Sequence, residues 1–327
     1  MFNHLSVASA FSFKYGTTQP HDLVARAAQF GAPALAITDR DSLAGVIRFV
    51  QAAKDFGIAP IVGVNLALDN SRVTLLAQSG TGKDSGWRSL CRLMSALRPD
   101  RNPPTLHLEK IKTLSEYTSN LILLHGPDSQ IANLITKHRP DQALHEFNKY
   151  RPYFADSVIE CVSHLAPGDG PRSTGHAGRM LGFARDHDLP AVITNGVRML
   201  DAADGPVADI LDAARKLVPL HKRHVERANN EAYLKDNQQM RDLADEISRA
   251  AGERSGRALL RTTQRISERC ILSPQEFGLG GIELPEAEVV GVNNYQEMRA
   301  LLRSRCESGL NWRYSSSDDL AKARVRL

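Results

Sequence analysis

The sequence lacks the features that mark membrane and secreted proteins. No apolar run among its 327 residues approaches the roughly 18 residues that a membrane-spanning helix needs. The N-terminus also has no basic region followed by an apolar segment and a cleavage site, which a secretory signal requires. We therefore expect a cytoplasmic protein with no membrane partner.

Cysteine and net charge are scarce as well. The four cysteines are far apart, and no two of them stand in the C-x-x-C spacing that is typical of zinc-binding and redox proteins. We expect all four to be reduced packing residues. The formal net charge of +4 is too small to indicate nucleic-acid binding by itself, so the distribution of charge along the chain matters more.

Apolar β-type runs alternate with helical periodicity through the first 200 residues. Two segments, 20–31 and 42–57, carry apolar residues at helical spacing and end at Gly31 and Gly57. Six runs predict buried strands: 33–38, 59–64, 73–77, 121–125, 157–162 and 190–194. This order predicts an α/β fold with a mainly parallel sheet, open or closed into a barrel.

Polar residues follow three of the predicted strands. In parallel α/β folds the chemistry lies at the carboxyl ends of the strands. The candidate positions are therefore the segment TDRD at 38–41, His125, and the segment TNGVR at 194–198.

The strand pattern fades after about residue 203, and the chain becomes helical and polar. Residues 255–270 place Leu259, Thr263, Ile266 and Cys270 on one helical face. Glycines and prolines between 273 and 294 predict a loop-rich connection, and a last amphipathic helix is expected over 295–310. We divide the chain into a barrel core at 1–203, a helical extension at 204–272, and a linker with a helix at 273–327.

Four stretches carry a resemblance to a known family. They are residues 4–66, WRSLCRLMSAL at 87–97, LPAVITNGVRML at 189–200 and ISERCILS at 266–273. In their order and spacing the chain resembles the N-terminal part of bacterial DNA polymerase III alpha subunits, above all the actinobacterial and error-prone paralogues. These proteins begin with a PHP (polymerase and histidinol phosphatase) domain. The resemblance implies a distorted, TIM-like β/α barrel with a helical C-terminal extension, and a role in DNA replication, repair or translesion synthesis.

The resemblance also implies a metal site, because active PHP domains hold zinc or manganese with histidines and carboxylates. Here six of the ligand positions carry other residues: Ser6, Ala8, Arg40, Asn65, Gly196 and Arg198. Alanine and glycine have no donor atom, and arginine cannot be deprotonated to bind a metal. We therefore expect a degenerate site, a pseudoenzyme with no catalytic residue, no metal and no other cofactor.

Four possible ligands remain at or near family positions, namely His4, Asp39, His125 and His164. They leave open a residual one-metal site, although isolated histidines are more often packing or surface residues. We further expect Arg40 and Arg198 to occupy the former metal space and to pair with nearby carboxylates such as Asp39 or Asp41. The alternative is that both arginines point into solvent.

The polymerase chemistry of the family needs a palm domain with closely spaced aspartates that hold magnesium. No such pattern is present, and the pair Asp318 and Asp319 lies in a serine-rich polar tail. The segment LLRSRCESGLNWRY at 301–314 resembles the family segment that leads into the palm. We therefore expect the chain to end before that domain, as a fragment, a split gene product or a truncated paralogue, and to lack polymerase activity alone.

Two basic segments are candidates for contact with DNA phosphates. Neither interleaves the aromatic residues that single-strand platforms use, so both are also consistent with solvated helix faces. The candidates are Arg215, Lys216, Lys222, Arg223 and Arg227 in the first segment, and Arg257, Arg261 and Arg265 in the second.

Three functions are consistent with these patterns. The first is a metal-free structural or interaction module that docks other polymerase domains, subunits or DNA. The second is a PHP phosphoesterase or 3′–5′ exonuclease with a non-standard metal site. The third is a free-standing DNA-binding protein.

Overall fold

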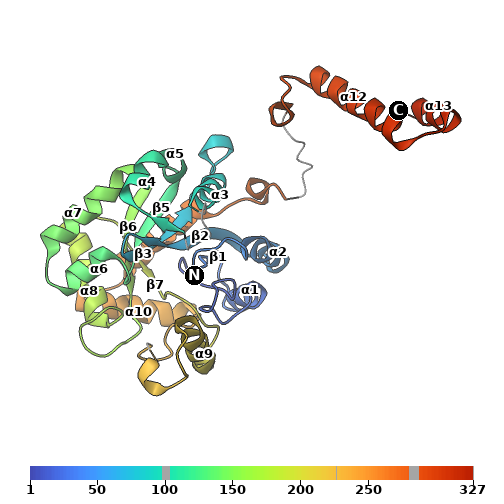
Figure 1. Ribbon diagram of the computed structural model, residues 1–327. Helices are drawn as coiled ribbons and strands as arrows, with labels where there is room; N and C mark the ends of the chain where they lie inside the picture. The colour runs from blue at the N-terminus through green and yellow to red at the C-terminus, as the bar shows by residue number, and fades with distance from the viewer. Residues whose placement is uncertain (98–103, 226, 280–286, 327) are drawn as a thin grey trace. The chain divides into compact units, whose positions relative to one another are not determined.

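The computed structural model describes residues 1–97, 104–225, 227–279 and 287–326 (Figure 1). The chain divides into two compact units, Met1–Phe277 and Gly278–Leu327. The first unit contains both the strands and the helices up to residue 270. The three-part division at residues 203 and 272 stays a prediction, and its linker includes residues 280–286, which lie outside the described residues.

A seven-stranded sheet forms the centre of the first unit. All six predicted strand runs are confirmed, as β1 Ala34–Ile37, β2 Ala59–Leu68, β3 Ser71–Ala77, β5 Leu121–His125, β6 Asp156–Val162 and β7 Ala191–Thr194. They lie in the order β1-β2-β3-β5-β6-β7, and a short strand that the sequence did not predict, β4 Thr105–Leu106, pairs with β2. β3 runs antiparallel to both neighbours, whereas the other pairs are parallel.

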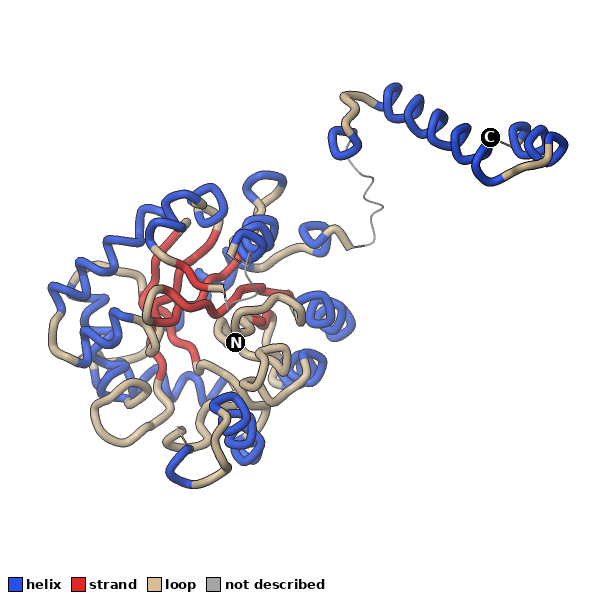
Figure 2. The backbone as a smooth tube through the Cα atoms, viewed as in Figure 1, coloured by secondary structure: helices blue, strands red, loops and turns tan. Residues whose placement is uncertain are grey.

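The N-terminal segment lies between the two ends of this sheet. On one side His4 bridges Leu35 of β1, and the amide of Ala36 donates to the carbonyl of His4 at 2.9 Å. On the other side Val7 bridges Val197, just after β7, and the amide of Ala8 donates to the carbonyl of Val197 at 2.8 Å. The sheet is therefore closed into the distorted β/α barrel that the sequence predicted, with helices around the strands (Figure 2).

Helices and short 3₁₀ turns surround the sheet. The two early helices end as predicted, because Gly31 and Gly57 adopt positive φ angles of 67° and 68° beyond them. The α-helices of the first unit are α1 Pro20–Gln29, α2 Val46–Phe56, α3 Gly86–Ala96, α4 Leu108–Thr113, α5 Ser115–Thr118, α6 Gln130–Thr136, α7 Pro140–Tyr150, α8 Thr174–Asp186, α9 Gly205–Lys216, α10 Asn237–Ala250 and α11 Arg257–Cys270. The 3₁₀ turns of the first unit are η1 Gly82–Asp84, η2 Arg151–Tyr153, η3 Ala202–Asp204, η4 Lys222–His224 and η5 Pro274–Phe277.

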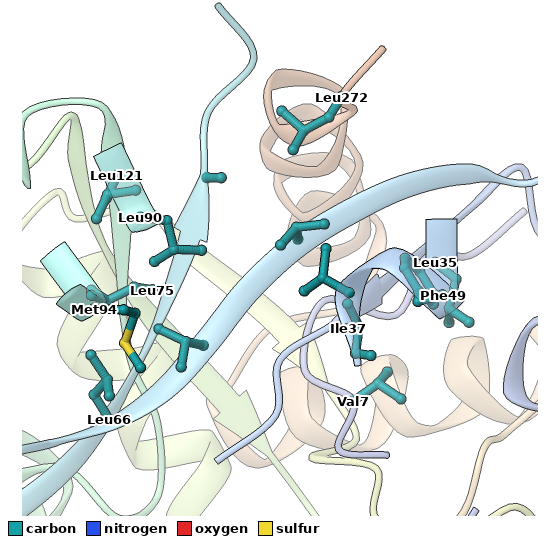
Figure 3. Packing of buried hydrophobic residues seen from close by; sticks show 14 of the residues in the cluster. Val7, Leu35, Ile37, Phe49, Leu66, Leu75, Leu90, Met94, Leu121 and Leu272 are labelled. Atoms are coloured by element: carbon teal, nitrogen blue, oxygen red, sulfur yellow. The ribbon is translucent and has the colours of Figure 1, made fainter. Parts of the chain in front are cut away.

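Side chains alternate between the inside and the outside of the barrel, as the pleat of a strand requires. In β5, Ile122 and Leu124 join a buried interior cluster, whereas Leu121 and Leu123 belong to the layer beneath the helices. Figure 3 shows part of that outer layer, with Ile37 of β1 and Leu66 of β2 among its labelled residues. The interior cluster takes members from the N-terminal segment and six strands: Leu5, Ala34, Ala36, Ile61, Leu76, Ile122, Leu124, Val158 and Val192.

α11 closes the end of the barrel at which the parallel strands begin. Ile266 and Cys270 join the interior cluster, and the hydroxyl of Thr263 accepts a hydrogen bond from the amide of Ile193 in β7 at 2.9 Å. The side chain of Asn3 donates to Ser267 at 2.7 Å. The predicted apolar face of this helix is confirmed, since its four predicted residues are all buried. The opposite end of the barrel, where the parallel strands end, is thereby left as the open one.

The described part of the second unit contains the 3₁₀ turn η6 Ala287–Val290 and the helices α12 Tyr295–Arg313 and α13 Ser317–Val325. α12 confirms the predicted last helix, and the side chain of Asn294 caps it by accepting from the amide of Glu297 at 2.9 Å. Neither helix buries a residue. Among the described residues, no helix combines the length and the apolar character that crossing a membrane demands.

Candidate functional site

A pocket lies at the carboxyl ends of the parallel strands, where the sequence placed the chemistry. Thr38 beyond β1, Gly126 beyond β5, Val162 at the end of β6 and Gly196 beyond β7 line its narrow inner part, of about 50 Å³. A wider outer part of about 470 Å³ continues from it. The two parts share five lining residues, namely Tyr15, Arg40, Arg72, Asp128 and Arg172.

Seven of the nine predicted metal-site positions line this pocket. Ser6, Ala8, Arg40, Asn65 and Gly196 line the inner part, and His164 and Arg198 line the outer part. The structure thus brings these scattered positions together. The other two, Asp39 and His125, line neither part.

Asp39 points away from the pocket toward the loop that follows the N-terminal segment. Its carboxylate accepts hydrogen bonds from the amide of Ser9 at 2.6 Å and from the hydroxyls of Ser9 and Ser12 at 2.9 and 2.7 Å. Burial raises the pKa of Asp39, and these hydrogen bonds oppose the rise. The carboxylate therefore shapes the loop rather than the pocket.

His125 and His4 also lie outside the pocket. His125 has the parity of the outward-facing residues of β5, and its ring packs against Phe147 at 5.4 Å between centroids. Burial lowers the pKa of His125 to about 3, so the ring is neutral at physiological pH. Burial likewise lowers the pKa of His4 to about 4, and the His4 Nε2 lies 2.9 Å from the carbonyl of Lys235.

The four remaining candidate metal ligands therefore do not lie together at one site. His164 alone of the four lines the pocket, and its Nε2 lies 2.7 Å from the carbonyl of Asn195. Within the described part of the chain, no three His, Cys, Asp or Glu side chains are grouped so that they could hold a metal ion. The geometry gives no support to the residual one-metal site.

Arg198 lines the pocket and pairs with a carboxylate, as predicted, but that carboxylate is neither of the two named examples. Its guanidinium forms a two-pronged ion pair with Asp212 of α9, at 3.0 and 3.2 Å, and also donates to the carbonyl of Tyr15 at 3.1 Å. The side chains of Arg198 and Asp212 are only 9% and 3% exposed. Pairing with Asp39 or Asp41 is wrong for Arg198, because serines bind Asp39 and Arg72 binds Asp41 at 2.9 Å.

Arg40 pairs with no carboxylate in the described part of the chain, so the predicted ion pair is wrong here too. Its guanidinium stacks on the ring of Tyr15 at 3.4 Å from the centroid, and Arg198 lies 4.2 Å from the same centroid. Such contacts stabilise a cation through the electron-rich ring face. Burial lowers the pKa of Arg40, and the positive charges of Arg72 and Arg215 add to that effect.

Sequence reasoning missed two carboxylates of the pocket, the buried Glu160 and the partly exposed Asp128. Glu160 of β6 accepts a hydrogen bond from the hydroxyl of Thr194 at 2.6 Å. Burial raises the pKa of Glu160, and hydrogen bonds from Thr194 and Ser6 oppose that rise only in part. Asp128 accepts from Arg172 at 2.6 Å. A charged residue within the apolar run SVIECV was the available signal for Glu160, because buried charges are rare without a local role.

Replacing Glu160 with glutamine is expected to remove a pH dependence of stability. The unfolded chain ionises Glu160 near pH 4.3, whereas the folded chain resists ionisation, so the wild type loses stability as the pH rises above that value. In urea unfolding at pH 4 to 8, the free energy of unfolding of Glu160→Gln should increase relative to that of the wild type as the pH rises. Glu268→Gln, on the exposed side of α11, serves as the control. A gain that is the same at every pH would contradict the expectation.

The metal set that the resemblance implies does not fit these residues. The inner pocket offers the hydroxyl of Ser6, the amide of Asn65 and the carboxylates of Asp128 and Glu160. Thr194 and Arg172 already bind the two carboxylates. Among the described residues no imidazole lines the inner part, and the surrounding arginines repel cations, so these residues do not fit a site for two or three zinc or manganese ions.

The predicted DNA contacts fall into two groups. Arg215 and Arg227 line the outer pocket and are bound to Asp212 at 2.9 Å and Asp209 at 2.7 Å. Lys216 and Arg223 are exposed nearby, and the side chain of Lys222 lies outside the described part. The second group lies exposed on α11: Arg257, Arg261 and Arg265. Contact of either group with DNA stays a prediction.

Comparison with known proteins identifies relatives of this chain. A family model described as "PHP domain" matches residues 4–164. The error-prone DNA polymerase of Symbiobacterium thermophilum is 33% identical over 291 residues, which cover 82% of this chain and 25% of that protein. The DNA polymerase III subunit alpha of Buchnera aphidicola subsp. Acyrthosiphon pisum is 30% identical, covering 76% of this chain and 22% of that protein. The chain thus spans about a quarter of the length of these curated relatives.

A second error-prone DNA polymerase, from Aromatoleum aromaticum, is 30% identical over 336 residues and matches 99% of this chain and 28% of its own length. Among solved structures, a putative metal-dependent phosphoesterase from Bifidobacterium adolescentis aligns with a TM-score of 0.39 at 14% identity, covering 75% of this chain and 96% of that one. The chain therefore contains a PHP domain, over residues 4–164, and is a relative of bacterial error-prone DNA polymerases and DNA polymerase III alpha subunits.

Proposed function

We propose that this chain is the PHP region of a DNA polymerase III alpha-like protein that serves DNA replication, repair or translesion synthesis in the cytoplasm. In this proposal the domain holds no catalytic metal and acts as a structural and interaction module. The observation that carries the proposal is the pair of arginines at former ligand positions. Arg198 is locked onto Asp212, and Arg40 is stacked on Tyr15 in the pocket.

Electrostatics support the loss of metal. A unit charge 4 Å from another contributes about 4 kcal/mol at an effective dielectric of 20, and a divalent ion doubles that figure. Each 1.4 kcal/mol weakens binding about tenfold. One arginine in the pocket without an ion-pair partner is therefore enough to oppose the binding of zinc or manganese. Arg40 forms no ion pair in the described part of the chain, and the more distant charge of Asp128 offsets only part of its own.

The comparisons support a module that works within a larger assembly. The relatives are DNA polymerases, and the matched stretch is about a quarter of each. The proposed partners are accordingly other polymerase domains or subunits. DNA contact through Arg257, Arg261 and Arg265 remains a further prediction, which a steep loss of single-stranded DNA affinity with rising salt would support.

Metal analysis of the purified full chain tests the proposal. Elemental analysis should find zinc and manganese well below one ion per chain, because the pocket lacks ligands and carries positive charge. Neither p-nitrophenyl phosphate nor single-stranded DNA should be hydrolysed when either metal is added. The proposal would be contradicted by three results together: stoichiometric metal in the protein, loss of hydrolysis in His164→Ala, and retained hydrolysis in His125→Ala. That result would instead support the phosphoesterase or exonuclease, since only His164 lines the pocket.

A further inference from the structure

Six arginines gather around the one pocket at the carboxyl ends of the strands. Three of them, Arg40, Arg72 and Arg172, line both its inner and its outer parts. The other three line the outer part only: Arg198, Arg215 and Arg227. They come from the loops after β1, β6 and β7, from β3, and from α9 and the segment beyond it. The fold thus concentrates cationic side chains at the mouth of the barrel.

Aspartates in the described part of the chain pair with five of these arginines. Arg72 pairs with Asp41 at 2.9 Å, Arg172 with Asp128 at 2.6 Å, and Arg227 with Asp209 at 2.7 Å. Arg198 and Arg215 share one carboxylate, Asp212. Among the described residues, these ion pairs join five of the six arginines to four aspartates, and Arg40 takes part in none of them. Burial raises the pKa of Glu160, which lines the inner part, and so disfavours its charged form.

Arg40 is held in place and still has unused donors. The hydroxyl of Ser12 accepts from its backbone amide at 2.9 Å, and its guanidinium stacks on Tyr15. Stacking occupies the face of the guanidinium, whereas its five N–H donors lie in the plane. None of those side-chain donors has a partner in the described part of the chain. A planar fork of N–H donors beside other cations matches the oxygens of a phosphate group.

We propose that this pocket binds the phosphate group of a small phosphorylated compound, with Arg40 as the principal contact and Arg72 and Arg172 beside it. The inference rests on the proposed absence of a catalytic metal, and it assigns binding without hydrolysis. The narrow inner part suits the anion itself. The outer part, at about 470 Å³, falls within the roughly 300 to 1,000 Å³ of small-molecule sites, which is too small for a duplex.

Calorimetric titration of the full chain in the presence of a metal chelator tests the inference. The probes are inorganic phosphate and ribose 5-phosphate, with sodium chloride added so that the ionic strength stays constant. We expect saturable binding of one anion per chain. Tighter binding of ribose 5-phosphate would indicate a phosphate monoester as the ligand, and equal binding would indicate the free anion. Absence of saturable heat for both probes would overturn the inference.

Variants show which side chain holds the anion. Arg40→Gln keeps the stem and removes the charge, so we expect affinity to fall at least about tenfold, as for a lost charge-assisted hydrogen bond. Arg40→Lys keeps the positive charge but loses the planar pair of N–H donors, so its affinity should lie between those of the wild type and Arg40→Gln. Arg241→Gln, exposed on α10, is the matched control and should bind like the wild type. Equal losses in Arg40→Gln and Arg241→Gln would overturn the assignment.

The same titration separates this inference from the proposed function. Phosphate binding that disappears with the chelator would contradict both, because the anion would then depend on a metal. Metal found in the protein, together with binding that survives the chelator, would contradict the proposed function alone. Circular dichroism of each variant checks folding, and the wild-type titration decides the inference even where a variant fails to fold.

Discussion

Replacing Arg198 with alanine is expected to lower the free energy of unfolding by about 3 kcal/mol, the lower end of the usual cost of removing one partner from a buried ion pair, because Arg215 still contacts Asp212 at 2.9 Å. In the wild type the side chain of Asp212 is only 3% exposed, so the loss of Arg198 removes one of its two cationic partners from a buried position. Burial alone would raise the pKa of Asp212, but hydrogen bonds from Arg198 and Arg215 lower it. The contribution of the pair is therefore present above about pH 4 and is lost as the pH falls through the lowered pKa of the folded state.

A double-mutant cycle isolates this ion pair from other effects of the substitution. Urea unfolding at pH 7 of Arg198→Ala, Asp212→Ala and the double variant measures the coupling. Arg26→Ala is the matched control, because Arg26 also grips a carboxylate with two nitrogens but that partner, Asp201, is half exposed. The control should lose about 1 kcal/mol or less. Equal losses in Arg198→Ala and Arg26→Ala would show that burial does not strengthen the pair.

Replacing Ile266 with alanine is expected to lower the free energy of unfolding by about 2 to 5 kcal/mol, as core isoleucine-to-alanine changes do. Ile266 is fully buried, and from α11 it closes the interior cluster at the start of the strands. The cavity left behind is bordered by rigid strands that cannot collapse into it. The sequence-based division assigns α11 to an extension, so a large effect would show that the helix belongs to the barrel core.

Ile210→Ala, on the surface of α9, is the matched control for this substitution. Ile210 is 55% exposed, so the same truncation should change stability by no more than about 0.5 kcal/mol. Thermal and urea unfolding of both variants compares the two sites. A loss in Ile266→Ala as small as that in the control would mean that the barrel tolerates an unsealed end.

The strands were predictable because each is a short apolar run bounded by turn residues. Residues 121–125, for instance, are buried throughout in β5. The helix ends at Gly31 and Gly57 were predictable for a local reason too, since glycine accepts the positive φ that stops a helix. The position of the pocket followed from one rule about strand ends. These features depend on residues that are near one another in the chain.

The contacts in the pocket depend on how separate elements pack together, and there the prediction was only partly right. Arg198 was expected to pair with a nearby carboxylate such as Asp39 or Asp41; it does pair with a carboxylate, but α9 supplies Asp212, and no local pattern shows how that helix packs. The antiparallel direction of β3 was likewise invisible in an apolar run. The orientation of His125, by contrast, was readable from the alternation of β5, in which it shares parity with the outward-facing Leu121 and Leu123.

The closure of the barrel by its first residues has a consequence for synthesis on the ribosome. The segment at 4–8 emerges early but pairs with residue 197, and Asn3 bonds to Ser267 near the end of α11. The barrel is therefore incomplete until about 270 residues have left the exit tunnel. A fragment cut at residue 164, where the family match ends, lacks β7 and the sealing helix. Such a fragment would expose the interior of the barrel, because only the later part of the same chain supplies the strand and the helix that cover it.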